Sequence, residues 1–147
     1  MADEIRVPIV SDSDMVPARA QGRALAAELG FSRTDATLIA TAISEIARNI
    51  VVHVGRGEIV LRPLYEDSRY GLLVVATDTG PGIEDIDAAL DHGSASGKGL
   101  GLGLPGARRL MDEFEIASEP GKGTKVTMKK WRIRNELERL RERRGRG

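Results

Sequence analysis

The chain has 147 residues, of which 41% are hydrophobic and 30% charged, with equal numbers of basic and acidic side chains. This composition fits one globular domain, and the zero net charge argues against a strongly basic nucleic-acid-binding domain. The absence of cysteine excludes disulfides and thiolate chemistry. The acidic first residues lack the apolar segment of a signal peptide, and the run Leu72–Ala76 is too short to span a bilayer. We therefore expect a cytoplasmic protein with no membrane span and no nucleic-acid partner.

The first half of the chain predicts a strand, two helices and a hairpin. Ser11-Asp-Ser-Asp14 is a cluster of residues suited to cap a first helix, for which Gly30 is a natural end. Ser32 or Thr34 can cap a second helix, which glycines at 55 and 57 terminate. The expected elements are a strand over 5–10, helices over 15–29 and from the cap to about 52, and antiparallel strands over 58–64 and 72–77.

The second half predicts further helices and a second hairpin around Pro120-Gly-Lys-Gly123. Because adjacent strands come as hairpins, we expect an α+β fold, a two-layer sandwich of helices on a mixed, mainly antiparallel sheet. Residues 1–131 would form this domain, and residues 132–147, with seven Arg and three Glu, a charged helical tail. The expected elements are helices over 83–90 and 102–111, a polar loop over 91–99, strands over 114–117 and 124–131, and a tail helix over 135–144.

Glycine occupies almost every second position between Gly97 and Gly106. Such alternation is costly in a regular element, and its common use is to let backbone N–H groups approach an anion closely. A Rossmann motif would need a strand directly before it, and a P-loop would need a different lysine spacing. The segment therefore predicts a phosphate-binding loop of another kind, in which Lys98 either reaches a phosphate or is simply solvated.

The second helix carries two polar residues beside an apolar stripe of isoleucines at 39, 43, 46 and 50. Glu45 and Asn49 are four residues apart and stack on a neighbouring face at the edge of the core. An amide oxygen such as that of Asn49 suits Mg²⁺, and Glu45 could orient water or take a hydroxyl proton. The alternative is that both are ordinary boundary residues.

Asp78 stands at the end of an apolar run, directly before Thr79-Gly-Pro-Gly82. A carboxylate there could accept a hydrogen bond from an exocyclic amine such as that of adenine, while the glycines let the backbone pass close to a planar base. An Asp that merely starts a turn explains the same pattern.

Together these segments resemble the Bergerat-type (GHKL) ATP-binding domain. Glu45–Asn49 is similar to its N box, Asp78–Gly82 to its first glycine box, and Gly97–Gly103 to its second glycine box. Gly123-Thr124 resembles the late Gly-Thr pair of the adenine pocket. Residues 41–49, 104–114 and 121–124 narrow the resemblance to the RsbT group of switch serine/threonine kinases.

This resemblance implies ATP and Mg²⁺ as cofactors, with Glu45 as catalytic base, Asn49 as metal ligand and Asp78 as the residue that reads adenine. Thr124 would assist at the adenine. The nucleotide and its lid would be lined by Gly80, Gly82, Gly97, Lys98, Gly99, Leu100, Gly101, Leu102 and Gly103.

The implied function is phosphorylation of STAS-domain proteins in a bacterial partner-switching module of the stress response, with activation of a PP2C-type phosphatase. An anti-sigma factor kinase of the RsbW or SpoIIAB type, which would bind a sigma factor, is the alternative within this class. A non-catalytic module that binds nucleotide only to fix its shape is the alternative outside it.

Overall fold

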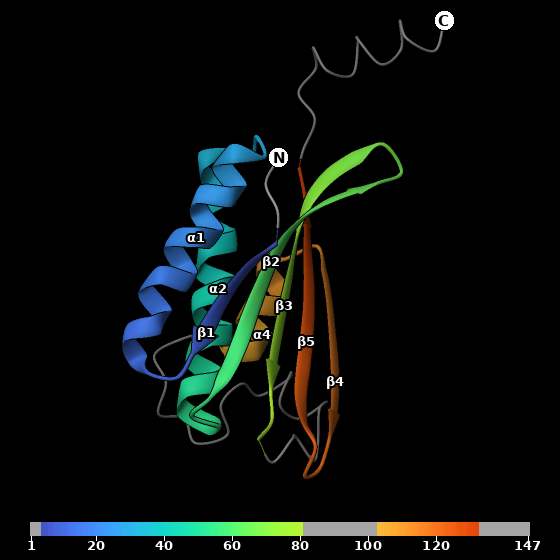
Figure 1. The fold of residues 1–147 in the computed structure, drawn as a ribbon. Helices are drawn as coiled ribbons and strands as arrows, with labels where there is room; N and C mark the ends of the chain where they lie inside the picture. The colour runs from blue at the N-terminus through green and yellow to red at the C-terminus, as the bar shows by residue number, and fades with distance from the viewer. Residues whose placement is uncertain (1–3, 81–102, 133–147) are drawn as a thin grey trace, which may run out of the picture.

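A five-stranded sheet with helices on one face forms the framework of the chain (Figure 1). The computed structural model describes residues 4–80 and 103–132. The elements are β1 (Ile5–Ile9), the 3₁₀ helix η1 (Asp12–Asp14), α1 (Met15–Glu28), α2 (Arg33–His53), β2 (Gly57–Glu66), β3 (Arg69–Asp78), α4 (Gly103–Leu110), β4 (Glu113–Glu119) and β5 (Gly123–Trp131). The expected helix over 83–90, the loop over 91–99 and the tail helix over 135–144 lie outside the described residues.

The strands lie in the order β1-β2-β3-β5-β4, and each neighbouring pair is antiparallel. The two hairpins, β2–β3 and β4–β5, are joined because β3 pairs with β5. This arrangement confirms the predicted α+β fold with helices and sheet in two layers. It also places the C-terminal ends of β3 and β4 beside the beginning of β5, at one end of the sheet, where Asp78 and Thr124 pair directly.

The helices pack on the sheet through the predicted isoleucine stripe of α2. Ile39, Ile43, Ile46 and Ile50 are almost completely buried, and α2 lies between α1 and α4. Gly22 of α1 permits the close approach of the two helices, because a Cβ at this position would meet the end of the Ile43 side chain. The central helix is therefore held from three sides, by its neighbours and by the sheet.

The ends of α2 follow the local signals. Ser32 is the N-cap, and its Oγ accepts a hydrogen bond from the Asp35 N–H at 3.0 Å. The helix ends at His53, and Gly55 follows with a φ of +91°, a conformation that suits glycine. Of the two predicted caps, Ser32 is the one used, so the helix begins at Arg33.

The β2–β3 hairpin is longer than its apolar runs indicate. A two-residue turn, Asp67-Ser68, closes it with φ values of +52° and +63°, as in a type I′ turn. The exposed rings of Tyr65 and Tyr70 contact each other across the two strands, with their centroids 4.8 Å apart and their planes tilted by 47°. In Figure 1 the tip of the hairpin extends to the upper right, away from the helices.

Candidate functional site

The polar edge of α2 contacts the beginning of α4. The Glu45 carboxylate oxygen Oε2 accepts a hydrogen bond of 2.9 Å from the backbone N–H of Gly103, which is 58 residues away in the chain. Glu45 and Asn49 are both half-buried and lie one helical turn apart. The structure therefore brings the Glu45–Asn49 segment to Gly103, the first residue of α4.

Opposite charges hold the two ends of α4. Glu45 lies at the N-terminus, where the helix dipole favours a negative charge. At the other end, the Lys130 ammonium donates a 3.0 Å hydrogen bond to the carbonyl oxygen of Leu110, and the Lys130 side chain is only 13% exposed. Both contacts complement the helix dipole, so α4 is fixed relative to α2 on one side and β5 on the other.

Asp78 forms a turn at the end of β3. Its Oδ1 accepts a 3.0 Å hydrogen bond from the backbone N–H of Gly80. This contact forms the Asp-initiated turn that was one of the two explanations of Asp78 from the sequence. Gly80 packs against Val54, the C-cap of α2, where an added Cβ would come within 2.6 Å of a Val54 methyl carbon. The turn therefore lies against the end of α2 that carries Asn49.

A row of three polar side chains crosses the sheet at this edge. Asp78 of β3 pairs with Thr124 of β5, and Thr124 pairs with Ser118 of β4. The row continues the face of the sheet that carries the core residues Ala76 and Val126, because side chains two residues apart share a face. Thr124 is buried, with 9% of its surface exposed, whereas Asp78 and Ser118 are half-buried.

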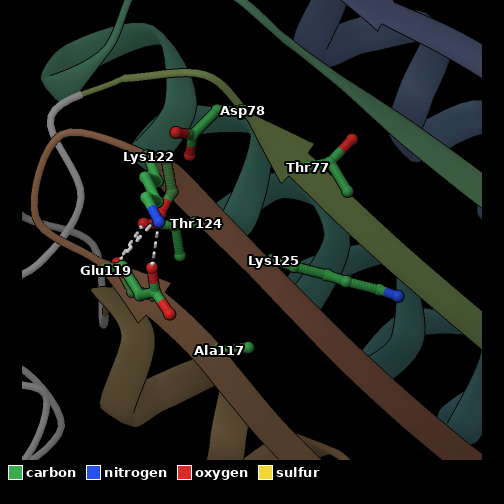
Figure 2. A pocket seen from close by; sticks show the side chains of 9 residues that line it. Thr77, Asp78, Ala117, Glu119, Lys122, Thr124 and Lys125 are labelled. Carbon is green, nitrogen blue, oxygen red and sulfur yellow. Dashed lines mark hydrogen bonds and ion pairs between the residues drawn. The ribbon is translucent and has the colours of Figure 1, made fainter.

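The three residues line a pocket with the β4–β5 turn. Figure 2 shows Asp78 and Thr124 on neighbouring strands, with Lys122 reaching toward Glu119. The Lys122–Glu119 ion pair of 3.2 Å is exposed, so it contributes little to stability. The Ser118 hydroxyl lies 2.9 Å from the Thr124 hydroxyl and donates to the carbonyl oxygen of Gly123 at 3.1 Å. The Ser118 and Thr124 hydroxyls and the Gly123 carbonyl oxygen are therefore linked by hydrogen bonds.

Several predicted site residues cannot be placed. Gly82, Gly97, Lys98, Gly99, Leu100, Gly101 and Leu102 lie outside the described residues. Those that are described form two groups, Glu45 with Asn49 and Gly103, and Asp78 with Gly80 and Thr124. Sequence reasoning missed Ser118, which lies just after the predicted strand over 114–117 and carries no local signal of its pairing with Thr124.

Asn49 fits a metal that is shared with a bound ligand. In residues 4–80 and 103–132, no group of three acidic, histidine or cysteine side chains is arranged to hold a metal ion by itself. Mg²⁺ commonly uses one or two protein oxygens together with phosphate oxygens and water. The half-buried amide of Asn49 is compatible with such a site.

Within residues 4–80 and 103–132, no helix is both long and apolar enough to cross a membrane.

A family model described as the histidine kinase-like ATPase domain matches residues 11–130. The chain belongs to this family. The matched residues include both groups of site residues, Glu45 with Asn49 and Asp78 with Thr124.

Curated relatives resemble the chain over most of its length. The serine/threonine-protein kinase RsbT of Bacillus subtilis is 45% identical over 131 residues, which are 89% of this chain and 98% of the relative. The anti-sigma F factor of Caldanaerobacter subterraneus is 34% identical over 124 residues, which are 80% of this chain and 85% of that protein.

A solved structure supports the fold. The RsbU and RsbW domains of Rv1364c from Mycobacterium tuberculosis match with a TM-score of 0.60 and 23% identity. The match covers 90% of this chain and 34% of the solved chain, so the chain corresponds to about a third of that structure.

Proposed function

We propose that the chain is an ATP-dependent serine/threonine kinase of the partner-switching type. The observation that carries this proposal is the hydrogen bond between Glu45 and Gly103, which joins the N-box helix to the end of the glycine-rich segment. The 45% identity to a serine/threonine-protein kinase over nearly its whole length supports the same reaction.

The nucleotide would lie along the edge of the sheet, with its base beside Asp78 and Thr124. Its phosphates would extend toward the glycine-rich segment that ends at Gly103, since backbone N–H groups at a helix N-terminus suit phosphate oxygens. Gly80 and Gly82 would line the base, and residues 97–103, with Lys98, would cover the phosphates. Asn49 would hold Mg²⁺ through its amide oxygen, and the ion would neutralise charge on the phosphates.

Glu45 would serve as the catalytic base. A serine or threonine hydroxyl of the acceptor protein attacks the γ-phosphorus, a new P–O bond forms, and the bond to the β–γ bridging oxygen breaks. ADP carries away the electron pair of the broken bond, while the hydroxyl proton passes to Glu45. The Oε2 oxygen of Glu45 accepts the hydrogen bond from the Gly103 N–H, which leaves the second carboxylate oxygen as the proton acceptor.

The proposed acceptor is a STAS-domain protein, and the proposed second partner is a PP2C-type phosphatase that the kinase activates. The relationship to anti-sigma F factors, at 34% identity, gives one alternative, in which the same pocket serves a protein that also binds a sigma factor. We further propose that residues 1–131 form the kinase domain and residues 132–147 a separate tail, since the family match ends at residue 130.

Two substitutions on α2 test the assignment because they should fail differently. Glu45→Gln keeps the size of the side chain and its ability to accept a hydrogen bond but removes its basicity. We expect normal ATP affinity and phosphoryl transfer reduced by about 10²- to 10⁴-fold, the usual range for a lost general base. Asn49→Ala should weaken Mg²⁺-dependent ATP binding as well as transfer.

The assay is single-turnover transfer from radiolabelled ATP to a purified STAS-domain protein, with nucleotide affinity measured in parallel. Glu28→Gln and Gln21→Ala on α1 are matched controls, because they make the same kinds of change at exposed helical positions. Full transfer by Glu45→Gln would remove the base assignment. ATP binding without transfer by the wild-type protein would favour the non-catalytic module, and retention of a sigma factor with ATP would favour the anti-sigma alternative.

A further inference from the structure

The direction of the hydrogen bonds around the Ser118 and Thr124 hydroxyls follows from the number of protons that each hydroxyl carries. The carbonyl oxygen of Gly123 can only accept, so the single hydroxyl proton of Ser118 is donated to it at 3.1 Å. Ser118 therefore has no proton for its 2.9 Å contact with Thr124, and the Thr124 hydroxyl must be the donor. The proton of Thr124 thus points along the sheet toward Ser118.

This arrangement makes Thr124 an acceptor toward the pocket. Its hydroxyl oxygen keeps its lone pairs, while its one proton is used by Ser118. The neighbouring Asp78 carboxylate is also an acceptor, and its Oδ1 already takes the N–H of Gly80. Two acceptors from adjacent strands therefore face the same pocket, on residues that pair directly across the sheet.

Two adjacent acceptors suit a ligand group that carries N–H bonds, such as an exocyclic amine with two protons. A carbonyl group in the same place would set lone pairs against lone pairs, and buried polar groups left unpaired in this way are strongly disfavoured. The burial of Thr124 strengthens the effect, because water has little access to compensate for the mismatch.

We propose that Ser118 is a positioning residue that sets base specificity. By fixing the proton of Thr124, it makes the pocket select an aminopurine nucleotide such as ATP over an oxopurine nucleotide such as inosine triphosphate. The inference rests on the proposed function, since it requires the base to lie beside Asp78 and Thr124. It adds a determinant that does not itself touch the base.

The test compares the affinities of three nucleotides with Mg²⁺: ATP, inosine triphosphate, and purine riboside triphosphate, which keeps the ring nitrogens of adenine and lacks its amine. In Ser118→Ala, the Thr124 proton has lost its acceptor and can turn toward the pocket. We expect the ratio of ATP affinity to inosine triphosphate affinity to fall about tenfold, which is the effect of about one hydrogen bond, because the Thr124 hydroxyl can now donate to the ligand. The preference for ATP over purine riboside triphosphate should fall as well.

Four further variants separate an effect on specificity from an effect on structure. Ser118→Thr keeps a hydroxyl at this position and should restore the wild-type ratios, whereas Ser13→Ala, an exposed serine in η1, should leave them unchanged. In a Thr124→Val background, Ser118→Ala should have no further effect on the ratios, because the residue through which it acts has been removed. Thermal unfolding of each variant shows that the folded protein is being measured.

The outcomes distinguish this inference from the proposed function. If the wild-type protein binds ATP but Ser118→Ala weakens all three nucleotides equally, or none, Ser118 only supports the hairpin and the inference is wrong. If the wild-type protein binds none of the nucleotides, the proposed function fails and the inference fails with it.

Discussion

A pair of glycine substitutions in the β4–β5 turn measures how tightly the structure holds the edge of the sheet beside Asp78. Gly121 and Gly123 both have positive φ, +80° and +89°. An added Cβ at Gly121 meets nothing within 4 Å, whereas one at Gly123 would collide with the backbone carbonyl oxygen of Asp78. Alanine at either position incurs the same backbone cost, but only alanine at Gly123 forces β3 and β5 apart.

The expected magnitudes follow from this difference. Gly121→Ala should lower the free energy of unfolding by about 0.5 to 1.5 kcal/mol, which is the left-handed backbone cost less the smaller entropy of the unfolded alanine chain. Gly123→Ala should cost about 1 to 3 kcal/mol more, as overpacking against an atom that cannot rotate away. Because the backbone terms largely cancel between the two variants, the difference reports the collision with Asp78.

Urea unfolding followed by circular dichroism gives both values. With a urea dependence of about 2 kcal/mol/M, the midpoint of Gly123→Ala should lie about 0.5 to 1.5 M below that of Gly121→Ala. ATP affinity should also fall further in Gly123→Ala, since its collision displaces the backbone of Asp78. Equal midpoints for the two variants would refute the reasoning, because they would mean that the strands separate here at no cost.

Two further substitutions test a cap and the proposed base contact. Ser32→Ala removes the side-chain oxygen that accepts the Asp35 N–H at 3.0 Å, so the free energy of unfolding should fall by about 1 kcal/mol; an unchanged urea midpoint would mean that the cap contributes nothing. Asp78→Asn replaces an acceptor by an amide that also donates, and ATP binding should weaken by about 1.5 to 3 kcal/mol, with exposed Asp12→Asn as the control; equal affinities of the wild-type and Asp78→Asn proteins would remove Asp78 from the pocket.

The elements that could be predicted are those whose signals are local. The isoleucine stripe and Ser32 define α2 because helical spacing and capping depend on residues within a few positions of one another. The β2–β3 hairpin was predicted too short, since its strands continue to Glu66 and from Arg69. Near the tip the side chains are exposed, so the apolar pattern stops while the backbone hydrogen bonds continue.

The contacts that could not be predicted are those that depend on register. Nothing in the neighbourhood of Ser118 reveals that it lies opposite Thr124, because pairing is set by the turn and by the whole hairpin. In the same way, the Glu45–Gly103 hydrogen bond joins residues 58 positions apart, and only the packing of α4 on α2 brings them together. The polar residues of the site could be named from the sequence, but their partners could not.

The face of the sheet opposite the helices gives the protein an internal optical reporter. Trp131 is the only tryptophan of the chain, and it is 7% exposed, with its Nε1 donating to Glu113 at 2.6 Å and the Arg69 guanidinium 4.0 Å from its ring centre. It stands seven residues from Thr124 along β5, roughly 23 Å at the rise of a strand. Its emission should therefore report unfolding of the sheet and should not change when a nucleotide binds at the other end, so that the stability of each variant can be measured independently of its nucleotide affinity.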